Sequence, residues 1–195
     1  SSTSRGLGDV YKRQALELGN RLNLNLLSNS TNEINKKATT SLKLTFQDLS
    51  DDSAYKITIT SDDVEIVSGD ESGFYYALVS LMQLSQNYHQ LVPCGSIFDK
   101  PRFSWRGQHL DTVRHFFSVD SLVKLLDLMS LFKLNKFHWH GVDDEAFRFK
   151  LDSYPEVATA TAKRGNDLLV PPVFGSGYDA TGGCYDKEDI DMIIS

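Results

Sequence analysis

Apolar and polar residues alternate with a period of two in the first part of the chain. The alternating runs cover residues 21–27, 42–46, 55–60 and 64–68, and clusters of Asn, Ser and Asp separate them. Such runs are typical of strands with one buried face that are joined by turns. From Ser72 the spacing changes, and Phe74, Leu78, Leu81 and Met82 recur at intervals that predict a helix with one apolar face. The pattern predicts a small α+β unit in which this helix packs on the sheet.

A second pattern, strand then helix then strand, occupies residues 106–140. Short extended runs cover residues 106–111 and 136–140. Between them, apolar residues recur at helical spacing: Leu122, Leu125, Leu126, Met129 and Phe132. We expect the helix to begin at Ser118, because its hydroxyl can accept the free amides of the first turn. We expect it to stop near Asn135, because Asn tolerates the left-handed cap conformation.

Two strands joined by a helix of this length predict a parallel pair with a right-handed crossover. In sheets built this way, sites form beyond the carboxyl ends of the strands, where the loops gather. The chemically capable side chains follow those ends: Asp111, Arg114 and His115 after the first strand, and His140, Asp143, Asp144, Glu145 and Arg148 after the second. We therefore expect cations, carboxylates and imidazoles to share one rim.

Composition narrows the possible classes of function. With 41% apolar and 11% aromatic residues among 195, the chain can bury a sizeable core. Its net charge of -6 provides no broad basic field, which argues against nucleic acid as the main partner. No apolar run approaches the roughly 20 residues that span a bilayer. Cys94 and Cys184 lie far apart without metal-ligand spacing, and we expect both to be free thiols.

Two motifs in this region resemble a known enzyme family. Residues 106–116 read RGxxLDxxRHF, and residues 133–148 read KLNxFHWHxxDDExxR. Together they are similar to the start of the catalytic domain of family 20 glycoside hydrolases, the β-N-acetylhexosaminidases. Short later segments, at residues 154–156, 171–177 and 182–194, are also similar to bacterial members. The resemblance covers about residues 73–195, and Gly141 departs from it because many relatives carry a larger apolar residue there.

The resemblance implies a non-catalytic α+β domain followed by a (β/α)8 TIM barrel. We expect residues 1–14 to be a foreign or disordered tail, residues 15–92 to form the α+β domain and residues 93–195 to form the first part of the barrel, with residues 92–100 as the link. Only about two of the eight strand-helix units of a barrel would then be present. The family's adjacent Asp-Glu pair follows a later strand. We therefore expect the chain to be an inactive amino-terminal fragment of an active enzyme.

For the parent protein, the resemblance implies hydrolysis of terminal N-acetylhexosamine residues (GlcNAc or GalNAc) from oligosaccharides or glycoconjugates. The configuration is retained because the substrate's own 2-acetamido oxygen attacks the anomeric carbon. No metal or organic cofactor is implied. The expected partner is an amino-sugar substrate, without nucleic acid or a membrane span. The sequence assigns neither an oligomeric state nor a compartment among periplasmic, secreted and cytoplasmic.

The resemblance also implies roles for individual residues. Arg114 matches an arginine that hydrogen-bonds hydroxyls of the terminal sugar, a task that suits a guanidinium with its fixed donors. Asp143 matches the first aspartate of the family's DDE and should orient a histidine in a relay to the catalytic acid. We expect His140 and Glu145 to bind substrate with Arg114. We expect Arg106, Asp111 and Asp144 to be structural: Arg106 and Asp111 should tie the strand ends together as a buried ion pair or hydrogen-bond network.

Several alternatives remain open from the residues themselves. Arg114 could be a surface arginine, the acidic run could be a solvated turn, and His138 could simply pack inside the fold. His138 and His140 alternate with Phe137 and Trp139, so the two imidazoles should share one side of a strand. With nearby carboxylates, such a pair also suits a divalent metal in a hydrolase. Apart from a hexosaminidase and a metal-dependent hydrolase, the protein could be a non-catalytic sugar-binding relative that lacks the later Asp-Glu pair.

Overall fold

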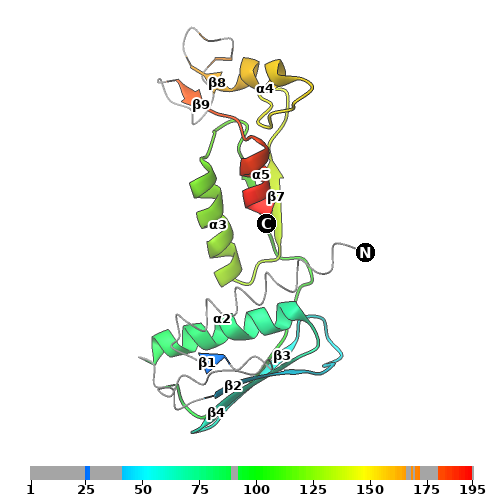
Figure 1. The fold of residues 1–195 in the computed structure, drawn as a ribbon, viewed down its shortest axis with the longest axis vertical. Helices are drawn as coiled ribbons and strands as arrows, with labels where there is room; N and C mark the ends of the chain where they lie inside the picture. The colour runs from blue at the N-terminus through cyan, green and yellow to red at the C-terminus, as the bar shows by residue number, and fades with distance from the viewer. Residues whose placement is uncertain are drawn as a thin grey trace. The chain divides into compact units, whose positions relative to one another are not determined.

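The computed structural model describes residues 25–26, 41–88, 92–165, 168, 170–171 and 180–194. The chain divides into two compact units, residues 1–104 and 105–195, whose elements are labelled in Figure 1. The expected tail at residues 1–14 lies outside the described residues, and so does the expected strand at 21–27, apart from Asn25–Leu26. Within the described residues, no helix is both long and apolar enough to cross a membrane.

The first unit contains a mixed sheet of five strands in the order β1-β2-β4-β3-β5. The strands are β1 (Asn25–Leu26), β2 (Ser41–Phe46), β3 (Tyr55–Ile59), β4 (Asp63–Ser68) and β5 (Gly95–Asp99). Strand β2 pairs in parallel with both β1 and β4, whereas β3 pairs antiparallel with β4 and β5. The runs of alternating residues at 42–46, 55–60 and 64–68 therefore form strands, as predicted.

Helix α2 (Glu71–Asn87) covers one face of this sheet (Figure 1). It begins earlier than Ser72, because Asp70 is the N-cap: its Oδ1 accepts the amide of Gly73 at 2.7 Å and its Oδ2 accepts the amide of Ser53 at 2.7 Å. The helix and the sheet share one apolar core: Leu42, Tyr55, Ile57, Ile59, Val64, Ile66, Tyr76, Ala77, Leu78 and Leu81. The predicted α+β unit is confirmed for the described residues.

Strand β5 was not predicted, because residues 92–100 were expected to be a link. Instead, Gly95–Asp99 pairs with β3 along its whole length, from Ile59↔Gly95 to Tyr55↔Asp99. Ile97 packs partly buried against the core of the first unit. The signal was weak because Pro93 and Gly95 are typical of turns. In addition, every residue of the strand except Ile97 is exposed. An edge strand with one inward side chain has little alternation to detect.

The second unit begins with the predicted strand-helix-strand motif. Strands β6 (Gly107–Asp111) and β7 (Lys136–His140) pair in parallel, with Gly107 opposite Lys136 and Asp111 opposite His140, and α3 (Val119–Leu131) connects them. The remaining elements are α4 (Pro155–Thr161), β8 (Lys163–Arg164), β9 (Thr181–Gly182) and α5 (Lys187–Ile194). Strands β8 and β9 pair antiparallel, and α3 and α5 contact each other (Figure 1).

Helix α3 begins as expected and ends differently. The Ser118 hydroxyl accepts the amide of Ser121 at 3.3 Å, which confirms the N-cap. The left-handed residue at the other end is Lys133, with a φ of 57°, whereas Asn135 accepts the amide of Arg106 on its Oδ1 at 2.9 Å. Leu122 and Met129 are buried as predicted, but Phe132 is 73% exposed. Cys94 and Cys184 are free thiols, as expected.

Candidate functional site

The loops after β6 and β7 leave the sheet side by side. Asp111 and His140, the last residues of the two strands, are direct partners in the parallel register. The Thr112 amide continues the pairing by donating to the His140 carbonyl at 3.0 Å, and the Thr112 hydroxyl donates to the same oxygen at 3.0 Å. Of the side chains predicted to share a rim, those of Asp111, Arg114, His140 and Asp143 contact one another there, whereas Arg148 is buried.

Asp111 shapes the first loop. Its Oδ1 accepts the amides of Val113 at 2.9 Å and Arg114 at 3.2 Å, and its Oδ2 accepts a hydrogen bond from Nη1 of Arg114. Arg106 and Asp111 were expected to tie the strand ends together as one ion pair or hydrogen-bond network, but Arg106 precedes the five-residue β6 and Asp111 is its last residue, so the two lie roughly 16 Å apart along the chain. Arg106 donates from Nε to the Lys133 carbonyl at 2.8 Å. The two residues therefore secure opposite ends of the strand.

Asp143 joins the two loops. Its Oδ2 lies 2.9 Å from Nε2 of His140 and 3.5 Å from Nε of Arg114, and its Oδ1 accepts the amide of Glu145 at 2.8 Å. The Arg114 side chain thus lies between two carboxylates, those of Asp111 and Asp143, and remains 52% exposed. A fixed and exposed guanidinium with its charge balanced can offer its outer N–H groups to a polar ligand.

The two carboxylates are held in their charged form. Burial by itself would raise the pKa of Asp111, but the hydrogen bonds from Arg114 and Val113 outweigh burial and lower it below its ordinary value. The same balance applies to Asp143, where burial is outweighed by the contact with His140 and by the amides of Glu145 and Ala146. The hydrogen bond to Asp111 in turn raises the pKa of Arg114. The rim is therefore an ionic network at neutral pH.

Glu145 is held by a buried arginine. Nη1 of Arg164 lies 2.9 Å from Oε2 of Glu145, and Nη2 donates to the Glu145 carbonyl at 3.1 Å. The Arg164 side chain is 1% exposed, whereas that of Glu145 is 36% exposed. One carboxylate oxygen of Glu145 is therefore fixed from below while the side chain still reaches solvent. Asp144, between the two engaged acids, is exposed.

Arg148 lies beneath both loops and is completely buried, with 0% exposure. Among the described residues, its guanidinium donates to main-chain carbonyl oxygens: Thr112 at 2.9 Å, Val113 at 2.6 Å, Thr161 at 3.4 Å, Ala162 at 2.8 Å and Gly183 at 3.0 Å. Burial lowers the pKa of Arg148, and the neighbouring charge of Arg164 lowers it further. The charge stays compensated because carbonyl dipoles surround it.

Aromatic side chains support this arrangement from below. Nε1 of Trp139 donates to the Thr112 hydroxyl at 3.0 Å, and the Trp139 ring lies edge-on to Tyr185 at 4.7 Å and to Phe149 at 5.0 Å. Gly141 fits here because a Cβ at that position would lie 2.3 Å from the Phe149 ring. Phe149 therefore occupies the space that a side chain at position 141 would need.

The imidazoles cluster on one side of the strand pair. The ring of His109 lies 4.8 Å from that of His138 and 5.8 Å from that of His140, which agrees with the alternation that placed His138 and His140 on one side. Within the described residues, however, no three His, Cys, Asp or Glu side chains are arranged to hold a metal ion. His140 instead directs Nε2 toward Asp143. His140 is therefore part of the ionic rim.

The sequence missed what Arg148 and Arg164 do. Arg148 was recognised only as part of the second loop, and Arg164 was not singled out at all. No local pattern marks Arg164, which lies 19 residues from its partner Glu145. For Arg148, the only available signal was its fixed place at the end of the DDExxR motif. Neither sequence distance nor composition indicates that these two cations are buried.

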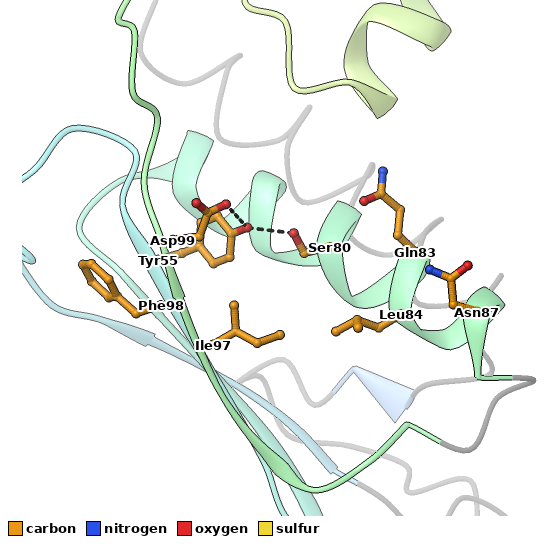
Figure 2. A pocket seen from close by; sticks show the side chains of 8 residues that line it. All are labelled: Tyr55, Ser80, Gln83, Leu84, Asn87, Ile97, Phe98 and Asp99. Carbon is orange, nitrogen blue, oxygen red and sulfur yellow. Dashed lines mark hydrogen bonds between the residues drawn. The ribbon is translucent and has the colours of Figure 1, made fainter.

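A separate hollow of about 390 Å³ lies in the first unit, between α2 and β5 (Figure 2). In it the Tyr55 hydroxyl lies 2.7 Å from Oγ of Ser80 and donates to Oδ2 of Asp99 at 2.7 Å. Burial raises the pKa of Tyr55, so the phenol stays neutral and can donate. The Phe98 ring points away from these groups (Figure 2). These polar groups tie α2 to β5. The charged side chains of the candidate site lie elsewhere, at the rim of the second unit.

Comparison with known proteins gives the same division of the chain. The model of glycosyl hydrolase family 20, domain 2, matches residues 7–100, so it begins inside the expected tail. The model of the glycosyl hydrolase family 20 catalytic domain matches residues 103–195. The two matches adjoin where the first unit ends and the second begins.

Individual relatives agree with these matches. A β-hexosaminidase of Vibrio furnissii is 33% identical over 147 residues, which are 74% of this chain and 24% of that protein. An N,N'-diacetylchitobiase of Vibrio harveyi is 37% identical over 146 residues, covering 67% of this chain and 16% of the relative. The crystal structure of a GH20 exo-β-N-acetylglucosaminidase from Vibrio harveyi in complex with N-acetylglucosamine has a TM-score of 0.74 at 33% identity, covering 94% of this chain and 28% of that one. The chain thus spans between 16% and 28% of the length of these relatives, and it belongs to glycosyl hydrolase family 20.

Proposed function

We propose that this chain supplies domain 2 and the first part of the catalytic domain of a β-N-acetylhexosaminidase. The whole enzyme would remove terminal N-acetylhexosamine residues from oligosaccharides or glycoconjugates. Family membership supports this, and so do the β-hexosaminidases and the chitobiase among the relatives. We infer that β6, α3 and β7 begin a (β/α)8 barrel, because parallel strands with a helical crossover are its repeating unit. The domain boundary would follow β5, since that strand pairs within the first sheet.

The observation that carries the proposal is the position of Arg114. Its guanidinium is held by Asp111 and Asp143, yet the side chain remains 52% exposed. We infer that its outer N–H groups bind hydroxyls of the terminal sugar. Such a donor works best when it is already fixed, because less side-chain entropy is then lost on binding. The exposed part of the Glu145 carboxylate, held by Arg164, would accept a hydrogen bond from another hydroxyl.

In the proposed reaction the configuration at the anomeric carbon is retained. The substrate's 2-acetamido oxygen attacks that carbon while a catalytic acid protonates the leaving oxygen. Asp143 would act indirectly: its Oδ2, 2.9 Å from Nε2 of His140, fixes the orientation of that imidazole. An imidazole held by a carboxylate in this way can contact the catalytic acid or the substrate in a defined tautomer. Asp144 would remain structural, without touching the sugar.

The test is an activity assay on the full-length protein that contains this chain. Release of the chromophore from an aryl β-N-acetylglucosaminide should proceed equally with and without a chelator. Arg114→Ala should lower kcat/KM by about 100-fold, because charged hydrogen bonds to the sugar are lost. Arg102→Ala is the matched control: Arg102 is also exposed, but it lies over the Phe103 ring at 4.7 Å. This variant should keep the wild-type rate.

Other outcomes would select the alternatives. A folded full-length protein that binds N-acetylglucosamine but shows no turnover would contradict the proposal and identify a non-catalytic sugar-binding relative. Turnover that is lost with chelator and restored by zinc would instead implicate a metal at His138 and His140. Equal activity of the Arg114→Ala and Arg102→Ala variants would remove Arg114 from the sugar-binding site.

A further inference from the structure

We propose that Arg148 is a positioning residue that sets the geometry of Arg114, Asp143 and Glu145 together. The inference rests on the proposed function, because it assigns Arg148 to the same sugar-binding rim. Arg148 itself reaches no ligand, since it is fully buried. Its guanidinium would act through main-chain carbonyls of two segments of the rim, and its own main-chain amide closes a third segment.

The first segment is the turn that presents Arg114. Nε of Arg148 donates to the Thr112 carbonyl at 2.9 Å, and Nη2 donates to the Val113 carbonyl at 2.6 Å. These two carbonyls lie between Asp111 and Arg114, so they belong to the turn that the Asp111 carboxylate caps from its other side. The turn is therefore held on one side by the Arg148 guanidinium and on the other by the Asp111 carboxylate. Its position decides where the guanidinium of Arg114 meets solvent.

The second segment is the loop that carries Asp143. The amide of Arg148 donates to the Gly141 carbonyl at 2.9 Å, and the amide of Asp143 donates to the Ala146 carbonyl at 3.1 Å. An antiparallel bridge between Val142 and Phe147 lies between these two bonds. Arg148 is thus the closing residue of a short loop with Asp143 near its tip. The same residue that fixes the Arg114 turn also fixes the base of the Asp143 loop.

The third segment leads to Glu145. Nη1 of Arg148 donates to the carbonyls of Ala162 at 2.8 Å and Gly183 at 3.0 Å, and the Gly183 amide donates to the Ala162 carbonyl at 2.7 Å. Arg164, which holds Glu145, follows Ala162 by two residues. Arg148 therefore fixes the chain from which the second buried arginine reaches up to the rim.

Only a guanidinium can make all the side-chain contacts of Arg148, which reach the first and the third segment. Its donors point in several fixed directions within one plane, whereas a lysine ammonium is a compact point charge on a flexible stem. Burying a cation costs free energy that an apolar side chain would avoid. A site that only needed filling would be served better by leucine or methionine. The use of arginine here indicates that the carbonyls it orients are what matters.

The test compares Arg148→Lys with Arg106→Lys in the full-length protein. Both arginines donate from Nε to a main-chain carbonyl in the second unit, but Arg106 does so at the opposite end of β6. Arg148→Lys should raise KM for an aryl β-N-acetylglucosaminide, and Kd for N-acetylglucosamine, by about tenfold or more, with a smaller fall in kcat. A displacement of a positioned group by only about 1 Å can lower the rate of an enzyme by about 100-fold. Arg106→Lys should leave both constants within about twofold.

A purely structural role would give a different result. In that case the two variants would differ only in stability, with KM and Kd unchanged, and the positioning role would be overturned. If Arg148→Lys does not fold, the wild-type protein provides the measurement. Titration with N-acetylglucosamine should then shift the ¹⁵N signals of the Arg148 guanidinium and leave those of Arg106 in place. Shifts at neither arginine, in a protein that binds the sugar, would overturn the proposal.

A final measurement separates failure of this inference from failure of the proposed function. The carboxyl pKa of Asp143 can be followed by NMR without any substrate, and the groups that face it are the His140 imidazole and the Arg114 guanidinium. Arg148→Lys should raise this pKa toward its ordinary value, because the turn that holds Arg114 3.5 Å from Asp143 loses the guanidinium that fixes it. If the wild-type protein shows no turnover but Arg148→Lys still raises the pKa of Asp143, the proposed function is contradicted and the positioning role of Arg148 is kept. An unchanged pKa would overturn the positioning role.

Discussion

The two units of this chain differ in the kind of side chain that is buried in their interiors. In the first unit the core is apolar, and Ile57, Ile66 and Leu78 are among its fully buried side chains. In the second unit the largest fully buried side chains are Arg148 and Arg164. Both arginines lie directly under the candidate site. Among the described residues, buried charge therefore coincides with the loops where the chemistry is proposed.

The difference follows from what each region must fix. A sheet and a helix satisfy their own main-chain hydrogen bonds, so they need only apolar contact to stay together. Loops lack regular partners for their carbonyls, and a buried carbonyl without a partner costs about 1–3 kcal/mol. Arg148 supplies donors to such carbonyls at the rim. In the second unit, burying the charge of Arg148 is unfavourable, but its hydrogen bonds hold the loops in one conformation.

The largest effect on stability is expected in the apolar core. Ile66→Ala in β4 should lower the free energy of unfolding of the first unit by about 2–5 kcal/mol, because it leaves a cavity against α2. Urea unfolding followed by far-ultraviolet circular dichroism measures this change. Lys56→Ala on the neighbouring β3 is the control, since Lys56 is exposed. Equal destabilisation by the two variants would mean that the first unit does not depend on this core.

A specific readout exists for the second unit. The chain has two tryptophans, Trp105 and Trp139, and both belong to residues 105–195. Tryptophan fluorescence therefore follows the unit with the candidate site, whereas circular dichroism follows both. Ile66→Ala should shift the dichroism transition more than the fluorescence transition. The reverse order would contradict the comparison between the two units.

An intermediate effect is expected at the helix caps, which both units use. Asp70→Ala should cost about 1–2 kcal/mol, because it removes hydrogen bonds of 2.7 Å to the amides of Gly73 and Ser53. Ser118→Ala, at α3, should cost less, about 0.5–1 kcal/mol, because its cap bond to Ser121 is longer at 3.3 Å. Urea unfolding of both variants, with the two spectroscopic probes, measures the difference. A larger loss for Ser118→Ala would show that bond length does not rank the caps.

The smallest effect is expected from pH. The folded-state pKa values of Asp111 and Asp143 are lowered below the unfolded value near 3.9. Their stabilisation is thus fully present above about pH 5 and is lost as the pH falls through the lower folded values. The free energy of unfolding seen by tryptophan fluorescence should decline between about pH 5 and pH 3. Asp143→Asn should flatten this decline, and an unchanged slope would exclude Asp143 as a source.

The first unit offers a useful contrast in that titration. The pKa of Glu65 is also lowered, chiefly by its hydrogen bond with Lys43 at 2.9 Å. That ion pair is solvent-exposed, so water and salt screen it and its contribution is small. The acid-dependent loss should therefore be larger in the fluorescence signal than in the part of the dichroism signal that comes from the first unit. Raising the salt concentration should reduce the contribution of Glu65 before that of Asp143.

Much of the local structure could be predicted from the sequence alone. The alternation at residues 55–60 and 64–68 predicted β3 and β4, because a half-buried strand must alternate. The spacing of Leu122 and Met129, with Ser118 before them, predicted α3 and its cap. The strand-helix-strand order then placed Asp111 and His140 at one rim. These predictions succeeded because periodicity and capping depend on near neighbours in the chain.

The tertiary structure alone decided how the site is held. Strand β5 exists because β3 offers an open edge, which no pattern in residues 95–99 reveals. Arg148 finds the Thr112 carbonyl 36 residues away, and Arg164 finds Glu145 19 residues away. Such contacts depend on where loops meet after the strands have paired, and a sequence carries no period for them. Residue types and order therefore determined which groups reach the rim, and packing determined which buried cations fix them there.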